Sequence, residues 1–316
     1  MLLSHRHMDP LGRTLAGTLM VLLSAICFSA KAIFAKLAYR HGVDALSLLA
    51  LRASFALPFF AVTAIVTGRQ AGALVLTRRE RLELFALGSA GYYLASYLDF
   101  VGLQYISAGL ERLILFLYPT LVIALNVVFH RERPTGKLFE AVLLSYGGVG
   151  LVVWNDRVSG SSDVALGSLL VFASAVAYAG YIAFGQKLIL RHGSTRVTGH
   201  ILTVTCLCAL AQFTLRFDFA KLRQPPQVVG LAAATGLLAT VIPAFLLTAG
   251  MKRLGTSKAS LLGTIGPVST LFFAAWFLDE PITLLQVAGS ALVLLGILRV
   301  SQAKNPAAPR VSTLPE

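Results

Sequence analysis

The chain has 316 residues, of which 56% are hydrophobic and 13% are charged, and its formal net charge is +13. Soluble domains carry about 25% charged residues, so a soluble globular protein is excluded and lipid is the expected solvent. Spans of about 20 apolar residues with short loops account for the whole length, which leaves no room for a soluble catalytic domain. The basic residues lie mostly between apolar runs, a pattern typical of membrane topology and not of nucleic-acid binding.

Apolar runs follow one another along the chain, divided by breaks that contain Arg, Gly or Pro. The expected fold class is therefore all-α integral membrane, with ten transmembrane helices. The segment 301–316 has three Pro and no apolar periodicity, so we expect a disordered cytoplasmic tail there. The expected spans cover residues 14–39, 45–67, 82–105, 107–129, 137–154, 165–190, 197–215, 228–250, 256–278 and 283–300.

The distribution of Lys and Arg predicts the orientation of the chain. Eighteen of these residues lie at the two ends of the chain or in the even-numbered gaps between runs, and five lie in the odd-numbered gaps. Cytoplasmic loops are enriched in Lys and Arg. Both termini are therefore expected in the cytoplasm, with the protein in the inner membrane.

The second half of the chain repeats features of the first. A shift of 148 residues superposes Gly102 on Gly250 and Pro119 on Pro267, and a shift of 150 residues superposes the first run on the sixth. Each half holds five expected spans, an odd number, so the second half must enter the membrane from the opposite side.

This arrangement is an inverted repeat, and such repeats permit alternating access around a site near the bilayer midplane. The predicted domains are a first repeat at 1–154 and a second repeat at 155–300, followed by the tail.

Short motifs at matching places in the two halves resemble the EamA-type repeat of the drug/metabolite transporter superfamily. The resemblance covers essentially the whole chain and implies a ten-helix exporter or exchanger of amino acids, other metabolites or drugs. It also implies that the first, third, fourth, sixth, eighth and ninth spans line the cavity. The motifs are Gly-Leu-Gln-Tyr-Ile-Ser-Ala-Gly at 102–109, Tyr-Pro-Thr at 118–120 and Glu-Arg-Pro-Thr at 132–135, with Gly-Pro-Val at 266–268 and Asp-Glu-Pro-Ile-Thr at 279–283.

Ionisable residues inside the spans are the main candidates for function, because each costs about 2.5–3.5 kcal/mol at a helix centre unless it is paired or solvated. Lys31, Arg52, Asp99, Glu111 and Arg112 all fall in the expected outer half of the membrane. Asp99 and Arg112 lie at similar depths across one hairpin, so we expect them to pair. Glu111 must face elsewhere, toward Lys31 or Arg52. The alternatives are ion pairs that only fix helix packing and side chains that snorkel to the interface.

These five groups sum to one positive charge, which suits a substrate with a carboxylate, including a zwitterion. Lys31 and Arg112 are expected to hold the anionic group. The predicted coupling ion is a proton. Glu111 is the candidate for taking it up, because we expect this acid to lack a dedicated cation. Arg52 is assigned mainly to structure, because it matches a position common to the family pattern.

Two prolines and three tyrosines complete the candidate site. Pro119 and Pro267 interrupt two spans at equivalent places, and interrupted helices in matching positions indicate a binding site, although a tolerated kink is the alternative. Tyr93, Tyr97 and Tyr118 could supply hydroxyl groups and aromatic faces to a cavity, with packing or an interfacial belt as the alternative.

The predicted function is a secondary transporter of small metabolites, with a small-molecule substrate, protons and the lipid bilayer as partners and a homodimer left open. A membrane-embedded enzyme and a channel or assembly subunit are the alternatives. No catalytic residues, cofactor or metal site are expected, because Cys27, Cys206 and Cys208 lie in apolar runs without metal-binding spacing. No nucleic acid partner is expected either.

Overall fold

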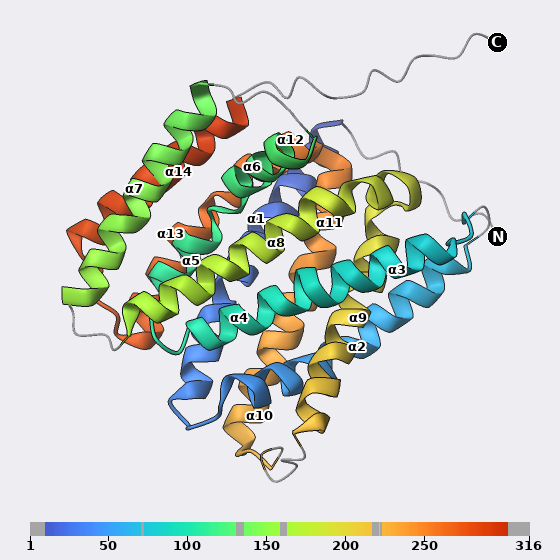
Figure 1. The fold of residues 1–316 in the computed structure, drawn as a ribbon, viewed down its shortest axis with the longest axis horizontal. Coiled ribbons are helices and arrows are strands. Elements are labelled where there is room, and N and C mark those ends of the chain that lie inside the picture. Colours follow the sequence, from blue (N-terminus) through green and yellow to red (C-terminus); the bar gives the residue numbers. More distant parts are fainter. Residues whose placement is uncertain are drawn as a thin grey trace.

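The structure is a computed structural model and describes residues 10–70, 73–130, 136–158, 163–216, 221 and 223–302. Its regular elements are helices, as expected (Figure 1). They are α1 (Pro10–Tyr39), α2 (Ala45–Gly68), α3 (Arg78–Ala86), η1 (Leu87–Tyr93), α4 (Leu94–Gly102), α5 (Ala108–Leu115), α6 (Tyr118–His130), α7 (Gly136–Val158), α8 (Val164–His192), α9 (Ser194–Leu215), α10 (Pro226–Gly236), η3 (Leu237–Val241), α11 (Ile242–Leu254), α12 (Thr256–Gly263), α13 (Ile265–Leu278) and α14 (Leu284–Gln302).

Eight helices in the described part of the chain are long and apolar enough to cross a membrane. The expected span at 82–105 is instead divided into α3, the π-helical η1 and α4, and the expected span at 283–300 is formed by the shorter apolar helix α14. The ten-span count therefore stays a prediction. Most of the expected tail, 303–316, and the motif at 132–135 lie outside the described residues.

Local sequence explains where many helices begin and end. Asp44 caps α2 by accepting from the backbone N–H of Ser47 at 2.9 Å, and Ser107 caps α5 in the same way. The helices α1 and α8 are each followed by a glycine with positive φ, 79° at Gly42 and 83° at Gly193. A residue with positive φ stops a helix, and glycine adopts this backbone conformation without strain.

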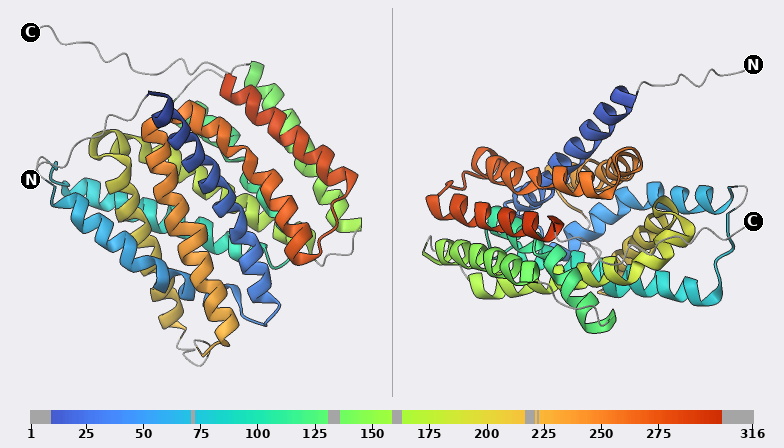
Figure 2. Two further views of the ribbon diagram at one scale, coloured as in Figure 1. Left: turned by 180° about the vertical axis from the view of Figure 1, so that it is seen from behind. Right: turned by 90° about the horizontal axis from the view of Figure 1, so that it is seen from above.

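Helices of the two halves pack against each other in a reciprocal way. α1 lies on α11 and α13, whereas α8 lies on α4 and α6. α7 and α14 run side by side at one edge of the molecule, and α2 packs against α9 on the other side (Figures 1 and 2). The interface between the halves therefore runs through the middle of the bundle.

Small residues allow these helices to approach closely. A side-chain carbon at Gly102 of α4 would lie 2.9 Å from the carbonyl oxygen of Gly167 in α8, and one at Gly167 would lie 3.0 Å from the carbonyl oxygen of Gly102. Neither position has space for a larger residue. Close crossings of this kind are typical of membrane helices.

The outer faces of the bundle carry large apolar side chains. Phe139 and Leu143 on α7 and Phe272 and Trp276 on α13 are more than half exposed. A soluble protein rarely exposes so much contiguous apolar surface. These faces are suited to contact with lipid.

Candidate functional site

Lys31 connects two buried carboxylates at the interface of α1, α4 and α5. Its Nζ donates to Asp99 Oδ2 and, at 2.8 Å, to Glu111 Oε1. The three side chains are 14%, 5% and 0% exposed, respectively. The remaining oxygens, Asp99 Oδ1 and Glu111 Oε2, are buried and have no hydrogen-bond partner among the described residues. We call Lys31, Asp99 and Glu111 the carboxylate–lysine cluster.

The expected pairing of Asp99 with Arg112 is wrong, because Asp99 pairs with Lys31. The two residues do lie at similar depths, but consecutive positions on a helix point about 100° apart. Glu111 therefore faces α1, whereas the Arg112 guanidinium lies 5.1 Å above the ring of Phe116, which follows α5. The expectation that Glu111 faces Lys31 is confirmed, and the premise that Glu111 lacks a cation is wrong, since both acids share one.

Arg52 lies near this cluster without joining it. Its Nε donates to Thr240 in the π-helical η3 at 3.2 Å. Its guanidinium lies 5.2 Å from the centre of the Phe100 ring, and the Lys31 ammonium lies 5.9 Å from the same centre. One aromatic ring thus contacts two cations, an arrangement in which cation–π attraction replaces part of their hydration.

The two prolines lie directly after breaks in the expected fourth and ninth spans. Pro119 is in the first turn of α6, after the break at 116–117, and Pro267 is in the first turn of α13, after a break at Thr264. Proline fits a first turn because no partner for its nitrogen is needed there. Ser29 of α1 donates to the carbonyl oxygen of Gly266 at 2.9 Å, which ties this second break to the first helix.

The tyrosines separate into two groups. Tyr93 and Tyr97 stack with ring centres 6.5 Å apart, and Tyr93 donates its hydroxyl to Gln212 of α9. Their neighbours place them against α2 and α9, on a different side of α4 from Asp99. Tyr118 instead meets Tyr178 of α8, with ring centres 5.5 Å apart.

Tyr92 and Tyr181 extend the second group. The ring of Tyr92 lies 5.8 Å from that of Tyr178 and 5.4 Å from that of Tyr181. We call Tyr92, Tyr118, Tyr178 and Tyr181 the tyrosine cluster. Tyr178 was not singled out from the sequence, although its spacing of three residues from Tyr181 places both on one face of a helix.

A cavity of about 580 Å³ opens where the expected topology places the outer surface. It collects charged residues from the ends of both halves, of which Lys36 and Glu280 lie 3.6 Å apart. The Glu280 carboxylate also accepts from the backbone N–H of Ala108 at the start of α5, at 3.1 and 3.2 Å. Tyr39, which also lines this cavity, donates to the carbonyl oxygen of Phe100.

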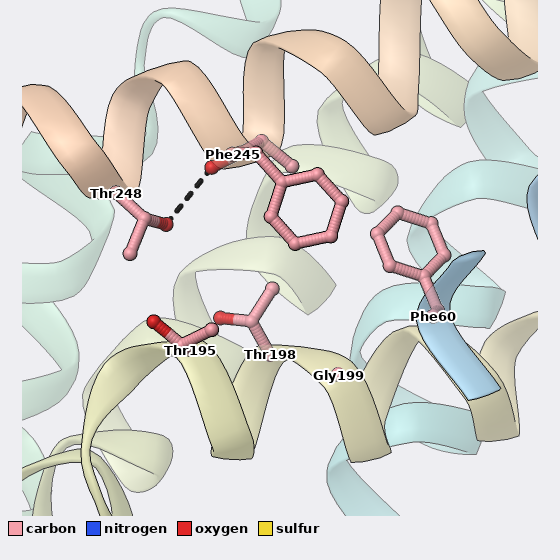
Figure 3. A pocket seen from close by; sticks show the side chains of 7 residues that line it. Phe60, Thr195, Thr198, Gly199, Phe245 and Thr248 are labelled. Carbon is pink, nitrogen blue, oxygen red and sulfur yellow. Dashed lines mark hydrogen bonds between the residues drawn. The ribbon is translucent and has the colours of Figure 1, made fainter. Parts of the chain in front are cut away.

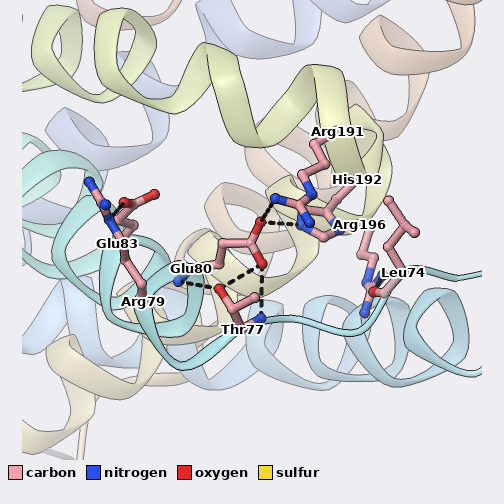
Figure 4. A network of polar contacts seen from close by, with 8 residues as sticks. All are labelled: Leu74, Thr77, Arg79, Glu80, Glu83, Arg191, His192 and Arg196. Carbon is pink, nitrogen blue, oxygen red and sulfur yellow. Dashed lines mark hydrogen bonds and ion pairs between the residues drawn. The ribbon is translucent and has the colours of Figure 1, made fainter.

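The opposite end of the molecule holds a polar network between the halves (Figure 4). Glu80, in the first turn of α3, contacts Arg191 at 3.1 Å and His192 at 3.0 Å, both at the end of α8. The same carboxylate accepts from the backbone N–H of Thr77 at 2.8 Å. The Thr77 backbone hydrogen bond and the contacts with His192 and Arg191 lower the pKa of Glu80 to about 2, so it is ionised near neutral pH.

A second, far smaller pocket of about 10 Å³ lies between α2, α9 and α11 (Figure 3). Phe60, Phe245 and threonines of α9 and α11 surround it, and Thr248 donates to the carbonyl oxygen of Ala244 at 2.8 Å. A single water requires a cavity of about this size. The pocket is therefore too small for a metabolite.

Comparison with known proteins agrees with this architecture. Residues 15–154 and 165–302 match the EamA-like transporter family. The uncharacterized transporter YcbK of Bacillus subtilis is 28% identical over 283 residues, which cover 87% of this chain and 89% of YcbK. The uncharacterized inner membrane transporter YicL of Salmonella typhimurium is 22% identical, with 92% of this chain and 97% of YicL covered.

A transporter of Archaeoglobus fulgidus is 28% identical over 252 residues, covering 80% of this chain and 87% of its own. A crystal structure of a protein with 19% identity matches 90% of this chain and 95% of its own with a TM-score of 0.59, which is a likeness of fold. Apolar spanning helices together with these relatives define a multi-pass membrane transporter. The chain belongs to the EamA-like transporter family, so the resemblance expected from the motifs is confirmed.

Proposed function

We propose that this protein is a secondary transporter that exports or exchanges small carboxylate or zwitterionic metabolites, such as amino acids, or related drugs. It lies in the inner membrane with both termini in the cytoplasm and works by alternating access between inverted repeats at 1–154 and 155–300. The observation that carries the proposal is a single buried ammonium shared by two carboxylates, Asp99 and Glu111.

The reciprocal packing of the halves supports the inverted repeat. The contacts of α1 with α11 and α13 correspond to those of α8 with α4 and α6. The π-helical segments η1 and η3 also fall at matching places in the third and eighth expected spans, and π-helical turns are frequent at functional sites. Two halves with equivalent contacts can exchange conformations, which is the basis of alternating access.

The orientation is tested by labelling single cysteines from each side of the membrane. In a variant whose native cysteines are replaced, a cysteine at Ser161 is expected to react from the periplasmic side and one at Thr135 from the cytoplasmic side. Reaction of both from the same side contradicts the inverted repeat.

The carboxylate–lysine cluster supports proton coupling. Lys31 can balance one carboxylate, and neither Arg52 nor Arg112 forms an ion pair with the second in the described part of the chain. Burial disfavours the charged form of a carboxyl group, and so does a neighbouring carboxylate. We assign the proton to Glu111, whose side chain is 0% exposed, whereas that of Asp99 is 5% exposed.

The function is tested in reconstituted vesicles with mixed radiolabelled metabolites and an imposed pH gradient. Glu111→Gln is expected to abolish uptake driven by the gradient and to retain exchange of substrate. Asp99→Asn should uncouple as well, because the remaining acid must then pair with Lys31. Glu83→Gln, at a partly exposed acid of α3 that pairs with Arg79, is the matched control and should transport like the wild type.

Two results contradict the proposal. If Glu111→Gln keeps full gradient-driven transport, the coupling proton is not carried by this cluster. If the flux rises with substrate concentration without saturating, the protein behaves as a channel and does not work by alternating access.

A further inference from the structure

Arg112 is a charged group for which the carboxylate–lysine cluster provides no partner. Its Nε is buried and has no hydrogen-bond partner among the described residues. The side chain also forms no ion pair with any of these residues. The guanidinium stacks over Phe116 at 5.1 Å and lies against Gly266, where a side-chain carbon would be 2.7 Å from its terminal nitrogen. The side chain is only partly exposed, and Glu111 and Asp99 act on its charge from beyond ion-pair distance. A charge removed from water without a direct counter-ion is costly, so its retention is expected where an anion binds.

The surroundings of Arg112 favour an anion further. Gly266 belongs to the first turn of α13, a helix of 14 residues. The start of a helix carries unpaired N–H groups and a partial positive charge, both of which attract anions. The break before α13 brings this helix start into the interior of the bundle, beside a guanidinium that can bind a carboxylate with two parallel hydrogen bonds.

The tyrosine cluster lies next to the same guanidinium. Arg112 lies over the ring of Phe116, whose centre is 6.5 Å from that of Tyr118, and the rings of Tyr178 and Tyr181 have their centres 5.6 Å apart. Most of the ring pairs meet edge to face, for example Tyr92 with Tyr181 at 83°. All four tyrosines are partly exposed, and edge-to-face packing of this kind is also the contact that another aromatic ring prefers.

The position of the cluster fits a transport pathway. Tyr92 belongs to the π-helical η1, Tyr118 begins α6 directly after the break, and Tyr178 lies near the middle of α8. The cluster is therefore in the middle of three expected spans, the depth at which transporters of inverted-repeat design bind their substrates. It also joins both halves of the chain.

We propose that Arg112 and the tyrosine cluster bind a carboxylate that is attached to an aromatic ring, with the carboxylate on Arg112 and the ring among the tyrosines. This inference rests on the transporter function proposed above and names the substrate class of the pathway. Aromatic cages also bind organic cations, but the Arg112 guanidinium beside the rings repels a cation. Lys31 takes no part in holding the carboxylate, because Asp99 and Glu111 already occupy it.

Binding to purified protein in lipid nanodiscs tests the proposal without a pH gradient. Phenylacetate is the probe, and isothermal titration calorimetry at neutral pH is the measurement. Cyclohexylacetate lacks the aromatic ring, acetate lacks the whole apolar group, and phenethylamine carries the opposite charge. Phenylacetate is expected to bind saturably, cyclohexylacetate more weakly, and the other two not at all.

Variants then assign the site. Arg112→Gln should weaken phenylacetate binding by about tenfold or more, since a charge-assisted hydrogen-bond pair is lost. Arg216→Gln, at an exposed arginine that ends α9, is the matched control and should bind like the wild type. Tyr178→Phe keeps the ring and should bind better than Tyr178→Leu. Size-exclusion profiles show which variants remain folded.

The proposal is overturned if the wild type shows no saturable phenylacetate binding at millimolar concentration, if phenethylamine binds as well, or if folded Arg112→Gln binds as the wild type does. These outcomes are separate from those of the proton-coupling test. Glu111→Gln can lose its coupling while phenylacetate binding persists, and phenylacetate binding can be absent while another carboxylate is transported with protons.

Discussion

Replacing Lys31 by Met is expected to lower the free energy of unfolding by about 3–5 kcal/mol, the cost of removing one partner from a buried ion pair. The two carboxylates that share this ammonium are 5% and 0% exposed, so water cannot replace the lost cation. Each acid must then take up a proton or stay as an unpaired buried charge.

Glu111→Gln is the informative comparison. It replaces the carboxylate that accepts the 2.8 Å hydrogen bond from Lys31 by a neutral amide, a loss of at most about 1.5–3 kcal/mol, but it also removes the repulsion between two carboxylates. Asp99 keeps its cation. The net cost is therefore expected to be clearly smaller than that of Lys31→Met. Replacing all three residues by neutral ones should recover much of the stability, because the cluster then holds no unpaired charge.

Unfolding by SDS in mixed detergent micelles, followed by circular dichroism near neutral pH, measures these differences. The order expected is wild type, Glu111→Gln and then Lys31→Met, from most to least stable. The reasoning is refuted if Lys31→Met is as stable as Glu111→Gln, because the two acids would then not depend on this ammonium.

Three further predictions follow from the packing, the polar network and the helix breaks. Gly102→Leu should lower the free energy of unfolding by about 1–3 kcal/mol through overpacking. Gly147→Leu should cost far less, because a side-chain carbon at Gly147 would have no neighbour within 4 Å. Equal losses of stability in the two variants would contradict the close crossing at Gly102. Glu80 has a folded-state pKa near 2, below its usual value of about 4.3, so its contribution is complete above pH 4.3 and falls as the pH approaches 2. The difference in melting temperature between the wild type and Glu80→Gln should therefore shrink on acidification, and a constant difference would argue against an ionised Glu80. Pro119→Ala and Pro267→Ala should be expressed normally and transport more slowly in the vesicle assay; normal transport by both would make these prolines mere packing features.

Much of the fold was predictable because its signals are local. Apolar runs identify membrane helices wherever they lie in the fold, and glycines such as Gly42 and Gly193 mark helix ends through their own backbone conformation. The motifs around Pro119 and Pro267 were enough to indicate the family, which the match over both halves confirmed. The division of the third expected span by η1 was not predictable, since a π-helical turn has no simple sequence signature.

The partners of the charged residues were predicted less well. The depth of a residue in the membrane follows from the rise per residue of the helix, so the similar depths of Asp99 and Arg112 could be predicted. Their pairing was wrong because depth says nothing about the direction in which a side chain leaves its helix. Glu111 faces Lys31, which was one of the two expected partners. The contacts of Tyr178 with rings on other helices could not be predicted from its position in the sequence.

The sequence by itself determined the class of the protein, an all-helical membrane transporter of the EamA-like family, because hydrophobicity and short motifs act over neighbouring residues. The tertiary structure decided that Asp99 and Glu111 share one lysine and that Arg112 is joined to the tyrosine cluster through Phe116. The physical reason is that the rotation of each helix about its axis is set by packing against other helices. Contacts such as that between Gly102 and Gly167 set this rotation, and they join residues far apart in the chain.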